Sequence, residues 1–323
     1  MIWLSTLLLA VGLVLLGGAS GIVITSIIAL SEKRKLRKSV VSFLLVAFST
    51  SLPELFVAIN SIIIGNMSVS LGDILGSNIT NISLIIGTSL IVATVISSRK
   101  RKMNIGEEDK KEFTTGLMLL SITLLMLLYL QYMSRFIGVL LLCVFFGYSY
   151  ILFRKRKEDV VSVPNETKGG RIRKELILIT AGIAGVIIGA RFTIESAIDI
   201  ATYLGVPSSI IGATLVAFGT SLPELTVDVR AAYRGHLEIV MGDIVGSCFL
   251  NSTLILGLLL TFTPFKVNLL VLSDLILFSV VSNLLLWYFL DNGKMGRREG
   301  LILLIFYLVS LLSILEILVL RVP

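Results

Sequence analysis

The chain has 323 residues, of which 55% are hydrophobic and 15% are charged. Soluble globular domains carry about 25% charged residues, whereas here the apolar residues gather in runs of about 20, the length that spans a bilayer as a helix. The net charge of +7 does not indicate a nucleic-acid partner, because Lys and Arg lie in short clusters between the apolar runs. The composition predicts an all-α membrane protein and excludes a large soluble domain.

Two further features bear on the class of protein. Cys143 and Cys248 each stand alone in an apolar run, so neither a disulfide nor a thiolate metal site is expected. The first apolar run starts at Met1 without a basic segment before it. We therefore expect this run to be a membrane span and not a cleaved signal peptide.

Ten apolar segments follow one another along the chain, and each is expected to be a membrane helix. They cover about residues 2–30, 39–65, 69–96, 112–130, 136–153, 175–202, 207–234, 237–263, 268–290 and 299–320.

The basic residues support this count. Of the 28 Lys and Arg residues, 24 lie in every second connection between the predicted spans. These five connections hold 5, 6, 8, 2 and 3 basic residues in chain order. Basic residues accumulate in cytoplasmic connections. We therefore expect a multi-pass protein of the cell membrane with both termini outside and a cytoplasmic linker at 154–174.

The two halves of the chain are related by a repeat. Residues 46–58 and 216–228 are identical at 10 of 13 positions, and residues 72–87 and 242–257 at 9 of 16. Both pairs share an offset of 170 residues. Because each half holds five spans, the second half should enter from the opposite face. The prediction is two inverted five-helix units, 1–153 and 175–323, joined by the linker 154–174.

The most unusual segments place a proline and a glutamate inside an apolar run. Residues 46–55 read VAFSTSLPEL and residues 216–225 read VAFGTSLPEL. A proline removes a helix hydrogen bond, so spans two and seven should break there. The break should gather loosened carbonyls and the Thr50, Ser51, Thr220 and Ser221 hydroxyls near Glu54 and Glu224. Oxygen ligands with a carboxylate suit a hard cation such as Ca²⁺ or Na⁺.

A purely local interpretation also exists for the first of these segments. Ser51-Leu52-Pro53-Glu54 can form a capping box with proline at a favoured early position of the second half-helix. We expect this to describe the local geometry in part. It does not explain why a charged residue, Glu54 or Glu224, occurs inside a membrane span in both halves of the chain.

Spans three and eight carry a second polar pattern. Asp73, Ser77 and Asn81 recur at intervals of four and share one helix face, and Asp243, Ser247 and Asn251 repeat them. The alternative is a packing motif, because Gly72 and Gly76, like Gly242 and Gly246, allow close helix approach.

The depth of these polar residues in the membrane separates them into two groups. Asn81 and Asn251 should be level with the glutamates and belong to an ion site. Asp73 should lie about 12 Å nearer the outer mouth and Asp243 nearer the inner mouth, as possible ion approaches.

The remaining charges give weaker signals. Arg191 and Glu195 are four residues apart and should pair with each other. Asp228 follows Glu224 by one turn, with Ala58 at the equivalent position of the first half. An inner-vestibule role and an ion pair with a basic residue such as Arg230 both fit Asp228.

At these motifs the sequence resembles the cation/Ca²⁺ exchanger (CaCA) superfamily, most closely its prokaryotic Na⁺/Ca²⁺ exchangers. The family motifs G-T-S-L-P-E and G-N-x-x-G-S-N-x-x-N/D are matched at 49–54 with 72–81 and at 219–224 with 242–251. The resemblance implies ten helices, with helices two, three, seven and eight around four small cation sites.

The resemblance also implies roles for single residues. Glu54 and Glu224 become the central ligands. The other implied ligands are Thr50, Thr220, Ser51, Ser221, Ser77, Ser247, Asn81 and Asn251, with the carbonyls of Ala47 and Ala217. The sequence departs from the family at Ser49, where glycine is usual, at Asp73 and Asp243, where asparagine is usual, and at Asn251, where several relatives have aspartate.

The predicted function is therefore an antiporter that exchanges Ca²⁺ for Na⁺ by alternating access, with both ions as transported substrates and no cofactor. An H⁺-coupled or K⁺-dependent exchanger of the same superfamily is the alternative. An intramembrane aspartyl protease built on Asp73 and Asp243 is a remote one, since Gly-x-Gly-Asp and Tyr-Asp motifs are both missing.

Overall fold

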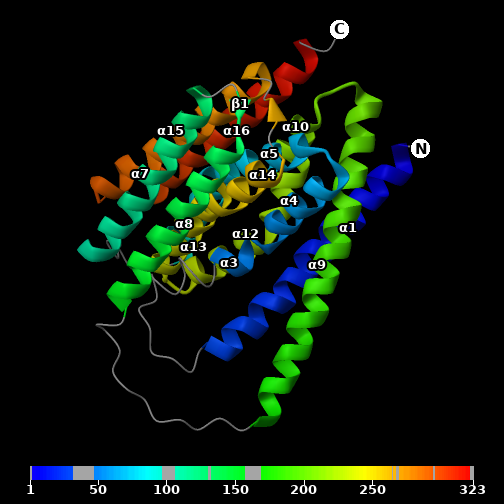
Figure 1. The fold of residues 1–323 in the computed structure, drawn as a ribbon. Helices are drawn as coiled ribbons and strands as arrows, with labels where there is room; N and C mark the ends of the chain where they lie inside the picture. Colours follow the sequence, from blue (N-terminus) through cyan, green and yellow to red (C-terminus); the bar gives the residue numbers. More distant parts are fainter. Residues whose placement is uncertain are drawn as a thin grey trace.

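The computed structural model describes residues 2–31, 47–96, 106–129, 132–156, 169–263, 265–266, 269–293 and 295–320. Within these residues the chain is almost entirely helical (Figure 1). Each of the ten predicted apolar segments contains helix. Residues 39–46 of the second predicted segment lie outside the described part.

The described part of the first half contains α1 (Ile2–Ser31), α3 (Ala47–Thr50), α4 (Leu52–Ile64), α5 (Met67–Ile79), the π-helix η2 (Thr80–Ile85), α6 (Ile86–Ile96), α7 (Glu107–Tyr129), the strand β1 (Tyr132–Met133) and α8 (Arg135–Arg156).

The second half contains α9 (Gly169–Leu204), α10 (Ser208–Ile211), the π-helix η4 (Gly212–Val216), α11 (Ala217–Thr220), α12 (Leu222–Tyr233), α13 (Leu237–Leu250), the π-helix η5 (Asn251–Ile255), α14 (Leu256–Phe262), the strand β2 (Phe265–Lys266), α15 (Leu269–Asp291) and α16 (Arg297–Leu320).

Among the described residues, six helical segments are long and apolar enough to cross a membrane. A bent pair, Ser208–Thr220 with Leu222–Tyr233, would make a seventh span. The structure thus supports an all-α membrane protein.

The predicted linker is shorter than expected. α8 continues to Arg156 and α9 begins at Gly169, so 154–156 and 169–174 are helical. Lys and Arg are good helix formers, and a helix can continue past the end of an apolar run.

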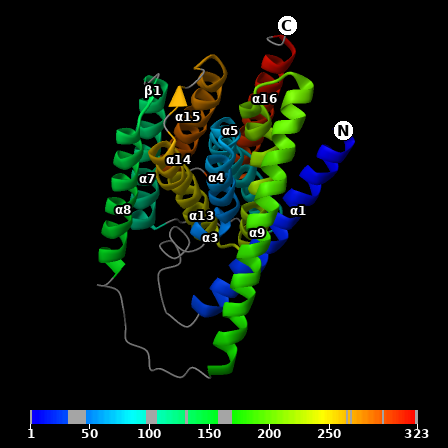
Figure 2. The same ribbon diagram turned by 45° about the vertical axis from the view of Figure 1, so that its right-hand side comes forward.

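Helices α1 and α9 lie side by side along one flank of the helix group, as both views show (Figures 1 and 2). Glycines bring them close. A Cβ on Gly12 would lie 2.9 Å from the Thr193 backbone nitrogen, and one on Gly189 would lie 2.9 Å from the Gly12 carbonyl oxygen. This pair therefore packs backbone to backbone.

The two halves of the chain exchange contacts instead of packing as separate units. α5 from the first half packs on α10 and η4 from the second, α6 on α16, and α14 on α8. A Cβ on Gly72 would lie 2.0 Å from the Ser209 carbonyl oxygen, and one on Gly76 would lie 2.3 Å from that of Ala213. The packing role predicted for Gly72 and Gly76 is confirmed.

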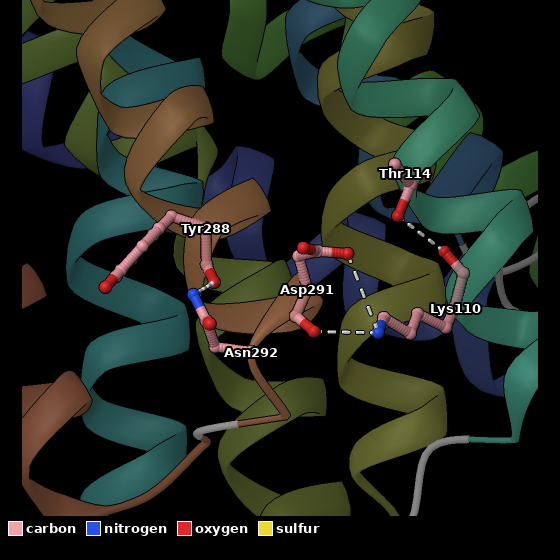
Figure 3. A network of polar contacts seen from close by, with 5 residues as sticks. All are labelled: Lys110, Thr114, Tyr288, Asp291 and Asn292. Atoms are coloured by element: carbon pink, nitrogen blue, oxygen red, sulfur yellow. Dashed lines mark hydrogen bonds and ion pairs between the residues drawn. The ribbon is translucent and has the colours of Figure 1, made fainter.

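Short contacts join the connections at each end of the bundle. At one end β1 pairs antiparallel with β2, with Tyr132 opposite Lys266, a pairing that the sequence did not indicate. At the other, Lys110 Nζ donates to the Asp291 carbonyl oxygen (2.8 Å) and lies 3.7 Å from its carboxylate (Figure 3). This second contact ties the start of α7 to the end of α15.

Replacing Gly76 by alanine tests the close packing. The added methyl group would meet the Ala213 backbone, so we expect a loss of about 1–3 kcal/mol from overpacking, larger than the gain of about 0.5–1 kcal/mol in helix propensity. Thermal unfolding of the purified protein in detergent measures it. Gly17→Ala is the control, because nothing lies within 4 Å of that position. Equal melting temperatures for the two variants would contradict the packing role.

Candidate functional site

The two Pro-Glu segments interrupt their helices at equivalent positions. Ser51 separates α3 from α4, and Ser221 separates α11 from α12. Pro53 and Pro223 fall in the first turn of the helices that follow, where the missing N–H costs least. At the second interruption the chain bends by 45°. The interruptions turn short backbone stretches and their hydroxyls toward the centre of the helix group.

The predicted capping box is wrong. Ser51 makes no side-chain hydrogen bond to the start of α4. Its hydroxyl instead lies 3.5 Å from Oε1 of Glu224, in the other half of the chain. The side chains of this motif therefore serve the contact between the halves and not the local helix end.

Every predicted site residue is buried. The twelve predicted ligands, as well as Asp73 and Asp243, are at most 1% exposed. Hydrogen bonds connect eight of them into two groups, each of which combines a broken helix of one half with α5 or α13 of the other.

The first group surrounds Thr50. Its hydroxyl lies 3.1 Å from Oδ1 of Asp243, 3.3 Å from the Ser247 hydroxyl and 3.2 Å from the Ala47 carbonyl oxygen. Ser247 reaches the same carbonyl at 3.5 Å. Polar groups from α3 and α13 thus meet at one point.

The second group repeats the first with the halves exchanged. The Thr220 hydroxyl lies 2.9 Å from Oδ1 of Asp73, 3.4 Å from the Ser77 hydroxyl and 3.2 Å from the Ala217 carbonyl oxygen. Each contact has its counterpart in the first group at an offset of 170 residues. The sequence repeat is therefore a repeat of contacts.

The two glutamates lie between these groups. Asp73, Ser77 and Thr220 face the Glu54 carboxylate. Glu224 faces Glu54, Asp243 and Thr50. Within the described residues neither Glu54 oxygen has a hydrogen-bond partner, and Oε2 of Glu224 has none. These are acceptors held in place without a donor.

In the described part of the chain no ion pair joins a positive side chain to either glutamate. Lys110–Asp291, Arg191–Glu195 and His236–Glu238 are ion pairs that lie elsewhere. Nor do three acidic, His or Cys groups converge on one point in the described residues. An ion bound here would therefore take most of its ligands from hydroxyl and carbonyl oxygens. That donor set suits a hard cation.

Asp73 and Asp243 are fully buried, and each carboxylate accepts a hydrogen bond from a threonine of the opposite half. Their role as ion approaches stays a prediction. The interrupted helix of one half brings its threonine to the level of the aspartate in the other.

Asn81 and Asn251 lie in or at the start of π-helices. η2 covers Thr80–Ile85 and η5 covers Asn251–Ile255. All four amide atoms of these two side chains are buried without a partner in the described residues. π-helical turns occur frequently at functional sites. The unpartnered amides are consistent with the predicted ion-site role, which stays a prediction.

Other predicted contacts have mixed outcomes. Arg191 Nε donates to Glu195 at 2.9 Å, which confirms that pair. The contact between Asn78 Nδ2 and Ser252 Oγ, 2.8 Å, was not predicted. Asp228 is fully buried, so the alternative of a pair with the exposed Arg230 is wrong. In the sequence, the position of Asp228 one helical turn after Glu224 was the feature that marked it as a candidate for the site.

A family model described as "Sodium/calcium exchanger protein" matches residues 4–154 and 174–315. The chain belongs to the sodium/calcium exchanger family. This match covers both halves of the chain, including all the groups described above.

Individual relatives agree with this assignment. The chain is 31% identical to the sodium/calcium exchanger MaX1 of Methanosarcina acetivorans over 354 residues, which covers 96% of this chain and 98% of that protein. It is 31% identical over 153 residues to sodium/potassium/calcium exchanger 2 of Mus musculus, covering 46% of this chain and 23% of the mouse protein.

A solved structure of the sodium-calcium exchanger NCX_Mj, soaked with 10 mM Na⁺ and zero Ca²⁺, matches with a TM-score of 0.71 and 26% identity. It covers 97% of this chain and 99% of that one. The chain is thus a membrane transporter and not an enzyme, which removes the aspartyl-protease alternative. Asp73 and Asp243 also contact threonines and are not held as a pair.

Replacing Thr220 by valine tests the second group of contacts. The substitution keeps the shape but removes the shorter of the two hydroxyl contacts to the Asp73 carboxylate, so we expect a loss of about 1–3 kcal/mol. The stabilisation of the protein by added Ca²⁺ should also weaken. Thermal unfolding with and without Ca²⁺ measures both.

Thr226→Val is the matched control for this experiment. Thr226 is an exposed residue of α12 whose hydroxyl bonds to the Leu222 carbonyl of its own helix. A loss in Thr226→Val as large as in Thr220→Val would contradict a specific role for Thr220.

Proposed function

We propose that the chain is a secondary active antiporter that exchanges Ca²⁺ for Na⁺ across the cell membrane by alternating access. One observation carries the proposal. Glu54 and Glu224 are fully buried without a positive partner in the described residues, and they lie among hydroxyl and carbonyl oxygens from both halves. The transported ions themselves would supply the missing positive charge.

The charge of the glutamates explains exchange. Their combined charge of −2 is neutralised by one Ca²⁺ or by two or more Na⁺. An empty site leaves carboxylates uncompensated in a medium of low dielectric, which costs several kcal/mol per ion. The empty carrier therefore crosses poorly between its two states. Release of one ion on one side has to be followed by binding of the other.

The proposed ligands are the central Glu54 and Glu224 together with the oxygen donors around them, which are Thr50, Thr220, Ser51, Ser221, Ser77, Ser247, Asn81, Asn251 and the Ala47 and Ala217 carbonyls. The two hydrogen-bonded groups around Thr50 and Thr220 support this assignment, because each brings a carbonyl, two hydroxyls and a carboxylate together.

The names of the relatives bear on the coupling ion. MaX1 and NCX_Mj are described as sodium/calcium exchangers, and this chain matches nearly the whole length of each. These names support Na⁺. The mouse protein, described as a sodium/potassium/calcium exchanger, matches over less than half of this chain. K⁺ dependence and H⁺ coupling are therefore the alternatives to be tested.

We also propose the membrane topology, in which ten transmembrane helices form two inverted five-helix units with spans two and seven broken. Both termini face outside and the linker between the units is cytoplasmic. Contacts at the two ends of the bundle support this arrangement. The β1–β2 pair joins two connections assigned to the outside, and Lys110–Asp291 joins two assigned to the cytoplasm. The start of α1 and the end of α16 lie at the end opposite to the start of α9 (Figure 2).

Flux through proteoliposomes tests the function. Vesicles loaded with Ca²⁺ should lose it faster under an inward Na⁺ gradient than under a K⁺ gradient. Glu54→Gln and Glu224→Gln should each reduce this flux at least tenfold, because a neutral amide does not balance the ion charge. Glu195→Gln serves as a control, since Glu195 lies exposed on α9. Efflux driven by a pH gradient instead of Na⁺ would assign the coupling to H⁺, and near-normal exchange in both glutamine variants would refute the site.

Cysteine labelling tests the topology. Two single-cysteine variants, Ser162→Cys and Pro323→Cys, are made in a Cys143→Ala, Cys248→Ala background. Their cysteines should react with a membrane-impermeant maleimide from opposite faces of the membrane. The cysteine at 323 should react in intact cells and the one at 162 only after permeabilisation. The reverse order would invert the proposed orientation.

A further inference from the structure

Asp228 breaks the symmetry of the polar cluster. Four of the five buried carboxylates there form equivalent pairs at an offset of 170 residues, Glu54 with Glu224 and Asp73 with Asp243. The fifth, Asp228, has Ala58 at the equivalent position. Ala58 is buried as well, at 1% exposure. The second half thus holds one acidic group more than the first, in an equally buried place.

The Asp228 side chain faces Asp243. The two carboxyl groups interact directly, and Glu224 is the next charged group beside them. Both oxygens of Asp228, and Oδ2 of Asp243, are buried without a hydrogen-bond donor in the described residues. The remaining oxygen, Oδ1 of Asp243, accepts from Thr50. Three carboxylate oxygens of this pair are therefore buried without a positive group or a donor from another residue in the described part of the chain.

Within the described part of the chain no basic residue is found beside this pair. Ion pairs are seen there for Lys110, Arg191 and His236, and none of these reaches Asp228. Arg230 is exposed, about 200° around the helix from Asp228. Like charges that share a buried site are unfavourable unless a cation lies between them or one of them holds a proton.

We propose that Asp228 and Asp243, with the Thr50 hydroxyl, form an additional Na⁺ site that exists in the second half alone. The inference rests on the proposed exchange function. The site lies about 6 Å along α12 from Glu224, toward the end of the helix that carries Arg234. In the proposed topology this is the cytoplasmic side of the central glutamates.

The ligand set favours Na⁺ over Ca²⁺. Ca²⁺ takes six to eight oxygen ligands in proteins, whereas the pair offers four carboxylate oxygens, one of which already accepts a hydrogen bond. Glu224 lies beside the pair, but within the described residues no set of three acidic, His or Cys groups is arranged to hold a metal ion. A monovalent ion with fewer ligands fits this arrangement, and it would leave the charge of the two glutamates free for exchange.

The variant Asp228→Ala tests this by equilibrium binding of ²²Na⁺ to the purified protein. It reproduces the residue that the first half has at this position. Because one carboxylate is removed from the shared site, we expect the variant to bind about one Na⁺ fewer per chain than the wild type. Removal of a buried unpaired charge should also raise the melting temperature in Na⁺-free buffer, and added Na⁺ should raise it less than in the wild type. Asp228→Asn provides a second variant of the same shape.

Flux separates this proposal from the proposed function. The variant should still exchange Ca²⁺ for Na⁺, with about one Na⁺ fewer per Ca²⁺ in the coupling ratio measured from reversal potentials. Glu238→Gln, a half-buried residue of α13 paired with His236, is the control and should keep the wild-type ratio.

The outcomes against the proposal are specific. Equal Na⁺ binding by wild type and both Asp228 variants would overturn it. It would also be overturned if the site that the variants lose binds K⁺ or a proton in the wild type and not Na⁺. A wild type without Na⁺-driven Ca²⁺ flux would refute the exchange function, while the ²²Na⁺ measurement would still decide whether the extra site exists.

Discussion

The structure depends on keeping carboxylates inside a helix bundle where, among the described residues, no positive side chain lies beside them. A buried charge is unfavourable unless it is paired. Here hydroxyl groups from the opposite half donate hydrogen bonds to the buried aspartates. Thr50 donates to Asp243 and Thr220 to Asp73, at 3.1 and 2.9 Å. Each such contact requires an interrupted helix that presents its hydroxyl sideways. The breaks, the threonines and the aspartates therefore form one arrangement.

The exchange of contacts between halves follows from the same requirement. Gly72 and Gly76 let α5 approach the backbone of α10 and η4 so closely that a Cβ would collide with carbonyl oxygens. This close approach brings Asp73 within reach of Thr220. Equivalent positions even meet each other, since Cys248 Sγ lies 3.9 Å from the Asn78 carbonyl oxygen and the two residues are 170 apart. The sequence repeat thus produces a single shared centre, and its symmetry is broken by the carboxylate of Asp228.

Particular residues show where prediction from the sequence succeeded. A proline and a charge in a membrane segment are costly and occur twice, and this signal pointed to Glu54, Glu224 and the hydroxyls around them, which the structure buries at the centre of the helix group. The close packing of Gly72 and Gly76 and the Arg191–Glu195 pair were predicted from spacing along a helix. The capping box at Ser51 was wrong, because the hydroxyl has a partner in the other half that local sequence does not reveal. The threonine partners of Asp73 and Asp243 could not be predicted by counting along one helix, because those partners come from the opposite half.

The sequence by itself determined the helical membrane class, the two related halves and the identity of the acidic centre. These properties follow from run length, from charge spacing and from a repeat, all of which are local or periodic. Only the tertiary structure decided which threonine serves which aspartate, that α8 and α9 extend into the predicted linker, that β1 pairs with β2, and that Asp228 faces Asp243 instead of a basic residue. Those contacts join residues far apart in the chain, and their geometry is set by how the two halves pack against each other.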